Sequence, residues 1–143
     1  MHAIITDPTE ADTLMVIGER LRPLLTTDMG SNVEIYDTQG DVGMGPPPHH
    51  HSWSESYVML EGSLDLIVGD APPQRLEAGM VAHAPAGVTH GYQIQADGTR
   101  FLTILSPGNG HAFFQQMDAE VAFPPNLEDV VRVAGGHGIE FPR

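Results

Sequence analysis

Apolar and polar residues alternate in short runs along most of the chain, and glycine or proline turns separate the runs. A period of two is typical of a β-strand that buries one face. Short strands with a turn about every eight to twelve residues predict an antiparallel sandwich or barrel. We therefore expect an all-β chain with strands over residues 13–17, 19–27, 33–37, 49–61, 63–68, 79–84, 90–95 and 100–105.

Proline and helix signals refine this pattern. Pro23 interrupts the second strand, and because proline cannot donate to a ladder we expect that strand at a sheet edge. From about residue 111 the pattern becomes helical. Residues 111–118 could form two helical turns, and Asn126 is placed as the N-cap of a short helix over residues 127–133. No internal repeat is visible, so we expect a single domain.

One alternating run carries chemistry as well as packing. Three prolines stiffen the chain before it, and alternation then places one set of side chains on a single strand face: His49, His51, Trp53, Glu55, Tyr57 and Met59. Two imidazoles and a carboxylate on one face can converge on a point, as in half of a metal site. The alternative is a histidine-rich surface loop, whereas an expression tag does not fit a mid-chain position between apolar runs.

A second stretch, residues 79–90, predicts a short strand, a proline–glycine turn and His90 at the start of the next strand. Together the two stretches resemble the cupin family. The first fits the motif G(X)5HXH(X)3-4E(X)6G through Gly43, His49, His51, Glu55 and Gly62. The second fits G(X)5PXG(X)2H(X)3N through Gly79, Pro85, Gly87 and His90, with Ile94 in place of the final Asn.

The resemblance implies a single-domain cupin β-barrel, a jelly-roll-like sandwich, over residues 1–143. Its core motifs would lie at about 33–105, with short helices in the tail at about 111–143. It also implies that one divalent transition metal is bound by His49, His51, Glu55 and His90. Zinc is the first expectation, and iron, nickel, copper and manganese also suit such ligands.

Two residues are candidates for catalysis. Glu55 is either a metal ligand or an acid/base beside the metal. By alternation His83 shares a strand face with Val81 and Pro85, where it could act as an alternative fourth ligand or as a proton shuttle. The other explanation for His83 is a partly buried histidine bonded to the backbone. The remaining histidines point away from this face or lie in loops and at the chain ends: His50, His2, His111 and His137.

Large side chains share the inward face with the expected ligands and would line a substrate pocket: Trp53, Tyr57, Met59 and Tyr92. Simple core packing is the alternative, and it is the better explanation for Met59 and Ile94. Trp53 and Tyr57 beside a metal would form a flat apolar wall, suited to an aromatic or polyketide-like small molecule.

Composition narrows the range of partners. The 143 residues carry a formal net charge of −13, which argues against nucleic acid and anionic membrane surfaces. Cysteine is absent, so there is no disulfide framework and no thiol nucleophile. No apolar run approaches the ~20 residues of a membrane span, and no signal-peptide pattern is visible, so we expect a cytoplasmic protein. Pairing through edge strands predicts a homodimer.

Three functions fit these observations. The first is a cyclase that closes rings in an aromatic polyketide, in which a metal polarises a carbonyl and a histidine or glutamate moves the proton. The second is a quercetinase-like dioxygenase, which needs a redox-active metal. The third is a non-enzymatic cupin that only binds a ligand. We rank the cyclase first because the chain is small, because its basic residues are all arginine, which indicates a high-GC genome, and because of His83.

Overall fold

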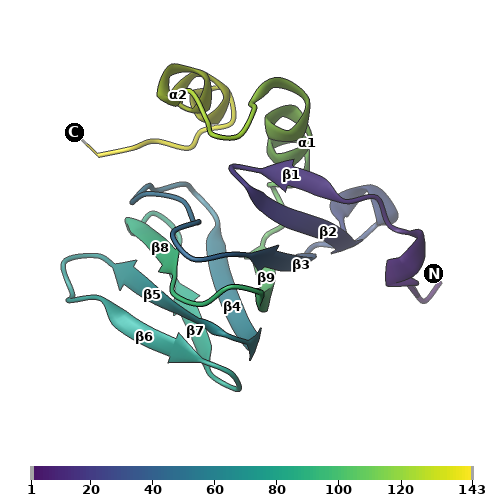
Figure 1. The fold of residues 1–143 in the computed structure, drawn as a ribbon. Helices are drawn as coiled ribbons and strands as arrows, with labels where there is room; N and C mark the ends of the chain where they lie inside the picture. The colour runs from purple at the N-terminus through teal and green to yellow at the C-terminus, as the bar shows by residue number, and fades with distance from the viewer. Residues whose placement is uncertain (1, 143) are drawn as a thin grey trace.

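Two antiparallel sheets form a sandwich, and two helices follow them in the chain (Figure 1). The computed structural model describes residues 2–142, so Met1 and Arg143, at the ends of the predicted domain, lie outside the described residues. The predicted β sandwich with short C-terminal helices is confirmed.

The larger sheet has six strands in the order β1-β2-β3-β9-β4-β7. Their bounds are Leu14–Val16 for β1, Glu19–Leu25 for β2, Glu34–Gly40 for β3, Thr99–Ser106 for β9, Ser54–Glu61 for β4 and Val81–Ala84 for β7. The smaller sheet has three strands in the order β6-β5-β8, with bounds Gln74–Glu77, Ser63–Val68 and His90–Ile94. Two short 3-10 helices precede β1 and β3, at Pro8–Glu10 and Thr27–Met29.

Two predicted details of the strands are wrong. β4 begins at Ser54 and not at residue 49, although burial still alternates along residues 49–59. β2, which contains Pro23, is not an edge strand because it lies between β1 and β3. β1 is so short that its pairing with β2 ends at Leu21, so the missing N–H of Pro23 interrupts no pair with β1.

Alternation along the strands collects the apolar side chains into two clusters. The first joins the large sheet to the helices and includes Val16, Leu21, Tyr36, Trp53, Leu105, Met117, Val130 and Val133. The second lies between the two sheets and contains Tyr57, Met59, Leu64, Leu66, Leu76, Ile94 and Phe101. Trp53 belongs to the first cluster and Tyr57 to the second, so Glu55 lies at the boundary between them.

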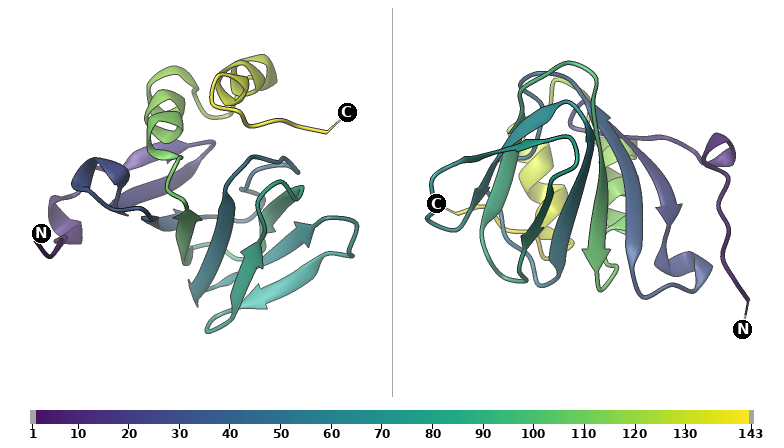
Figure 2. Two further views of the ribbon diagram at one scale, coloured as in Figure 1. Left: turned by 180° about the vertical axis from the view of Figure 1, so that it is seen from behind. Right: turned by 90° about the horizontal axis from the view of Figure 1, so that it is seen from below.

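The helices α1 (His111–Glu120) and α2 (Leu127–Gly135) lie on the side of β1 and β2, away from β5 and β6 (Figure 1, Figure 2). Asn126 caps α2 as predicted, since its side chain accepts the N–H of Glu128. The N-cap of α1 is Gly110, which offers no side chain, and the buried carboxylate of Glu34 on β3 accepts its N–H at 2.9 Å. A strand residue therefore holds the start of α1 in place.

Within residues 2–142 no helix has the length and apolar character needed to cross a membrane.

Candidate metal centre

The backbone itself brings His49 and His90 together. The N–H of each donates to the carbonyl oxygen of the other, at 2.9 and 2.8 Å, which forms an isolated antiparallel bridge. The proline segment before His49 lies directly against Gly91, where a Cβ atom would be 2.8 Å from the nitrogen of Pro48 and 2.9 Å from the oxygen of Pro46. The absence of a side chain at Gly91 therefore permits the close approach that positions the two histidines.

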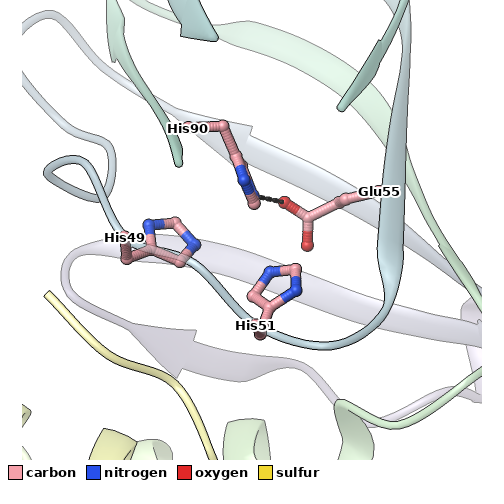
Figure 3. Close-up of side chains that lie close together, drawn as sticks. All are labelled: His49, His51, Glu55 and His90. Carbon is pink, nitrogen blue, oxygen red and sulfur yellow. Dashed lines mark hydrogen bonds and ion pairs between the residues drawn. The ribbon is translucent and has the colours of Figure 1, made fainter. Parts of the chain in front are cut away.

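Four side chains converge at this point (Figure 3). His49 and His51 come from the segment before β4, Glu55 from β4, and His90 from the start of β8. One ligand atom of each lies within 4.8 Å of those of the others, and all four residues are buried. The structure thus brings together the set that the family resemblance implies. Three imidazoles and a carboxylate form a donor set that suits zinc and other divalent transition metals.

Hydrogen bonds decide which nitrogen of each ring is free. The Nδ1 atom of each ring lies 2.8–3.0 Å from a backbone carbonyl oxygen two residues away: His49 with Pro47, His51 with Trp53, and His90 with Val88. A carbonyl oxygen only accepts, so each Nδ1 carries a hydrogen. The Nε2 atoms of His49 and His51 are left to bind a metal, and that of His90 faces Glu55, the fourth member of the set. This is the arrangement that outer partners impose on metal-binding histidines.

Burial sets the charge of two of the rings. It lowers the pKa of His49, and it lowers the pKa of His51 to about 4. Both imidazoles are therefore neutral at neutral pH, the form that coordinates a metal.

In the His90–Glu55 pair, contacts of the two side chains outweigh the effect of burial on each pKa. Burial disfavours the charged form of His90, but its hydrogen bond to Glu55, at 3.2 Å, and the charge of Glu55 together raise the pKa of His90. Burial also disfavours the carboxylate of Glu55, yet hydrogen bonds from His90 and from the Tyr57 hydroxyl lower its pKa. Glu55 is therefore ionised and can act as the anionic ligand of the set.

An apolar cavity of about 90 Å³ adjoins the cluster. His49, His51 and Glu55 line one part of it, and the indole of Trp53 stacks on the ring of His51 with centroids 4.1 Å apart. Most other lining side chains are apolar, among them Leu105, Phe113, Phe114, Met117, Ile139 and Phe141. A cavity with polar donors in one place and apolar walls elsewhere is typical of a small-molecule site.

A second hollow, here called the outer groove, lies next to this cavity and has a volume of about 480 Å³. The turn after β1, the glycine-rich segment before the prolines, and the chain around the start of α2 form its walls, which include Ile17, Val42, Phe123 and Leu127. Ile17, Pro47 and Val130 line both hollows. A molecule too long for the inner cavity can therefore extend past these shared residues.

Three of the four predicted pocket residues line the cavity: Trp53, Tyr57 and Tyr92. The fourth assignment, Met59, is wrong. Met59 is 1% exposed and packs in the cluster between the two sheets, away from the cavity. It follows Tyr57 on the inward face of β4, but one step further from Glu55, where Leu64 and Phe101 fill the space.

The prediction that His83 faces the metal is also wrong. His83 is exposed, and its Nδ1 atom lies 2.7 Å from the hydroxyl of Ser56 on the outer face of the sheet. His83 pairs with Ser56, and the neighbouring pair joins Ala84 to Glu55. His83 does share a face with Val81, as alternation requires, but that face points to solvent, and the small residues Ala82 and Ala84 point inward.

Two contributions to the cavity were not predicted. Glu19, at the start of β2, is 2% exposed and lines the cavity. It has the same parity as Leu21, so alternation alone could have indicated an inward carboxyl group. The C-terminal segment contributes Ile139 and Phe141, held by a backbone bridge between His50 and Glu140. No local pattern indicates that contact, because it joins distant parts of the chain.

A two-sheet β sandwich with three histidines and a glutamate converging inside it defines a class of small metal-binding β proteins. Residues 40–106 match the model of the family described as the cupin domain. That segment contains all four converging residues, and the fold of the chain is that of a cupin sandwich.

Comparison with known proteins gives distant relatives. The chain is 23% identical over 116 residues to quercetin 2,3-dioxygenase of Bacillus subtilis (strain 168), a match that covers 79% of this chain and 34% of that protein. The chain thus spans about a third of the length of the curated relative it matches.

Solved structures show the same fold. KdgF from Halomonas sp. superposes with a TM-score of 0.66 at 18% identity, over 74% of this chain and 94% of that one. The polyketide cyclase RemF from Streptomyces resistomycificus superposes with a TM-score of 0.63 at 22% identity, over 75% and 79% of the two chains. At these identities the likeness concerns the fold.

Proposed function

We propose that this protein is a metal-dependent enzyme that closes a ring in an aromatic or polyketide-type small molecule. The observation that carries the proposal is the buried cluster of His49, His51, Glu55 and His90 beside an apolar cavity. A divalent ion held there would supply a Lewis acid for a substrate carbonyl, and zinc suffices for that chemistry. A poly-β-ketone suits the site because it offers carbonyl oxygens on an otherwise uncharged carbon chain.

The residues around the cluster bind and orient such a substrate. Trp53, which lines the cavity and stacks on His51, would provide an apolar wall for an aromatic or enolic ring. The phenylalanines of α1 and Phe141 close other sides of the cavity and exclude water, which favours condensation over side reactions. The outer groove would accept the remainder of a longer chain. Because His83 lies outside, proton transfer falls to carboxyl groups inside the cavity.

A second candidate is a quercetinase-like dioxygenase. Two observations favour it: without His83 the donor set is three histidines and one glutamate, and the curated relative is a quercetin 2,3-dioxygenase. The polyketide cyclase RemF shares the fold of this chain, so the fold alone does not separate the two candidates. Oxygen dependence does separate them, since cleavage by a dioxygenase consumes dioxygen and ring closure does not.

The test uses protein loaded with zinc, iron, nickel, copper or manganese, with and without oxygen. One probe is a short synthetic triketone whose carbonyls alternate with methylene groups, which forms a phenol when it cyclises. The other is quercetin. Anaerobic ring closure by the zinc-loaded protein, lost in His90→Ala, would support the proposal. If oxygen uptake matches the loss of quercetin, and only a redox-active metal gives this activity, the dioxygenase would replace the cyclase as the proposed function. Tight metal binding with neither reaction would favour a ligand-binding cupin.

A further inference from the structure

Glu19 is a carboxyl group without a charged partner. Its side chain lines the same cavity as His49, His51 and Glu55, but it comes from the opposite part of the large sheet, at the start of β2. The Tyr92 hydroxyl lies 2.8 Å from Oε1 and 2.7 Å from Oε2, and residues 2–142 provide no cation for either oxygen. One hydroxyl has one hydrogen to donate, so the second oxygen of an ionised Glu19 would remain unsatisfied.

The surroundings of Glu19 are built to admit a carboxyl group and to keep it neutral. On β3 the neighbouring residue is Gly40, where a Cβ atom would lie 3.3 Å from Cγ of Glu19 and 2.6 Å from Cδ1 of Ile94. The titratable groups that face Glu19 are Tyr92 from β8 and Tyr57 and Glu55 from β4. Burial raises the pKa of Glu19 to about 8; the Tyr92 hydrogen bond opposes this shift and the charge of Glu55 adds to it.

We propose that Glu19 is the catalytic acid of the cavity, which protonates the substrate oxygen that becomes a hydroxyl group as the ring closes. The inference rests on the proposed function and assigns a proton donor to it. The donor lines the same cavity as the metal cluster without belonging to it. Glu19 would supply the proton, and a metal ion held by the cluster would polarise the carbonyl.

The proton balance closes without any further reagent. The enol form of a β-diketone supplies the electron pair of its C=C bond, which forms the new C–C bond to a carbonyl carbon of the same chain. The π bond of that carbonyl breaks, and its oxygen takes the proton of Glu19. The enol oxygen becomes a carbonyl and releases its own proton, which returns to the carboxylate of Glu19. Loss of water from the cyclic product then gives the aromatic ring.

The activity test compares the pH dependence of ring closure in zinc-loaded wild-type protein and Glu19→Gln, with the synthetic triketone as the probe. Because the neutral acid is the active form, wild-type kcat should fall as the pH rises through about 8. Glu19→Gln keeps the shape of the side chain but should lose at least about 100-fold in kcat, together with this alkaline limb. Glu77→Gln, an exposed glutamate on β6, is the matched control and should behave as wild type.

A second variant distinguishes a catalytic role from a structural one. Tyr92→Phe removes the hydrogen bond that lowers the pKa of Glu19, so the alkaline limb should move to higher pH. A third measurement needs neither substrate nor metal. The infrared carbonyl band of a protonated carboxylic acid should be present in wild-type protein at neutral pH, disappear above about 8, and be absent in Glu19→Gln.

The possible failures are distinguishable. If wild-type protein closes the ring but Glu19→Gln retains its rate and alkaline limb, the assignment of Glu19 is overturned and the proposed function stands. Absence of the infrared band at neutral pH in folded wild-type protein would also overturn it. If zinc-loaded wild-type protein is as inactive as His90→Ala, the proposed function fails, and the role of Glu19 fails with it.

Discussion

The Nε2 atom of His90 lies 3.2 Å from Oε2 of Glu55, and the other ring nitrogen of His90 lies 3.0 Å from the carbonyl oxygen of Val88. Both nitrogens thus face acceptors. With Glu55 ionised, both nitrogens donate in the absence of a metal, which agrees with the raised pKa of His90. The position between His90 and Glu55 therefore holds either a proton or a metal ion, and the two compete for it.

Zinc binding should release a proton at pH values below the raised pKa of His90. The free protein holds a proton on Nε2 of His90 up to its raised pKa, and the metal-bound form does not, so the affinity should fall as the pH falls through that value. About one proton should leave per zinc ion, because His49 and His51 are already neutral. Calorimetry in two buffers of different ionisation enthalpy measures the number. Glu55→Gln removes the partner of His90 and should reduce the release. An unchanged release in that variant would contradict this account.

The metal content of histidine variants tests the donor set directly. Protein purified with its metal should hold about one divalent ion per chain, since residues 2–142 contain one converging cluster. His90→Ala should weaken zinc binding by more than about 100-fold, the upper range for loss of an outer partner. His83→Ala is the matched control and should keep full occupancy, because His83 is exposed and bonded to Ser56. The zinc content of each variant is measured by elemental analysis after dialysis, and equal losses of zinc from both variants would refute the site.

Glu19 gives a stability test that needs no substrate. Burial raises the pKa of Glu19 to about 8; the charge of Glu55 adds to this shift and the Tyr92 hydrogen bond opposes it. A glutamate in the unfolded chain titrates at about 4.3. Between these values the folded state holds a proton that the unfolded state has released. The free energy of unfolding should therefore fall as the pH rises through this window, by up to about 1.4 kcal/mol per pH unit.

The comparison is with Glu19→Gln, which does not titrate. Relative to wild type, the free energy of unfolding of this variant should increase across the same window and stay level outside it. Urea unfolding at a series of pH values provides the curves. Parallel curves for the two proteins would show that Glu19 has an ordinary pKa in the fold.

Alternation predicts most strands and the shared face of His49 and His51 well, because both depend on local backbone geometry. The convergence of His90 with them came from the motif resemblance. His49, His51 and Glu55 share a face through parity alone, and Gly91 and the prolines before His49 then set their distance from His90. Parity does not say which face is inward, and for that reason His83 was misplaced. On its strand, β7, the apolar residue Val81 is 66% exposed, so an apolar neighbour on the same face does not indicate the buried side.

Contacts between distant segments could not be predicted from local patterns. Phe141 reaches the ring of His49, with centroids 6.1 Å apart, only because the C-terminal segment pairs with His50. The hydrogen bond between Glu19 and Tyr92 likewise joins the first strands to the smaller sheet. Each depends on how the sheets and the tail pack, and neither leaves a period or a motif in the sequence.

Assembly can be tested at the N-terminal segment. Ile5 is 92% exposed and Ile4 is 42% exposed, so an apolar surface lies uncovered before β1. A homodimer would bury it, and Ile5→Asp should then shift the protein to monomer at micromolar concentration in light scattering. Val81→Asp, on the far edge of the large sheet, is the control and should stay dimeric. A monomeric wild-type protein would contradict the prediction.

Phe141 should contribute to ligand affinity without contributing to metal affinity. Its ring lines the cavity and packs near His49, and the backbone bridge between His50 and Glu140 holds it there (Figure 3 shows the C-terminal segment in yellow beside His49). Phe141→Ala should weaken quercetin binding to the zinc-loaded protein by about 10- to 150-fold, since burying a large apolar side chain contributes about 1.5–3 kcal/mol.

Tryptophan fluorescence can follow the binding, because Trp53 is the one tryptophan of the chain and lines the same cavity. Met29→Ala changes a half-exposed apolar residue that does not line the cavity and should leave the affinity unchanged. Zinc content should be equal in all three proteins, because Phe141 offers no ligand atom. Wild-type affinity in Phe141→Ala would mean that the ligand does not occupy this cavity, whereas a loss of zinc would mean that the tail stabilises the metal cluster and not the ligand.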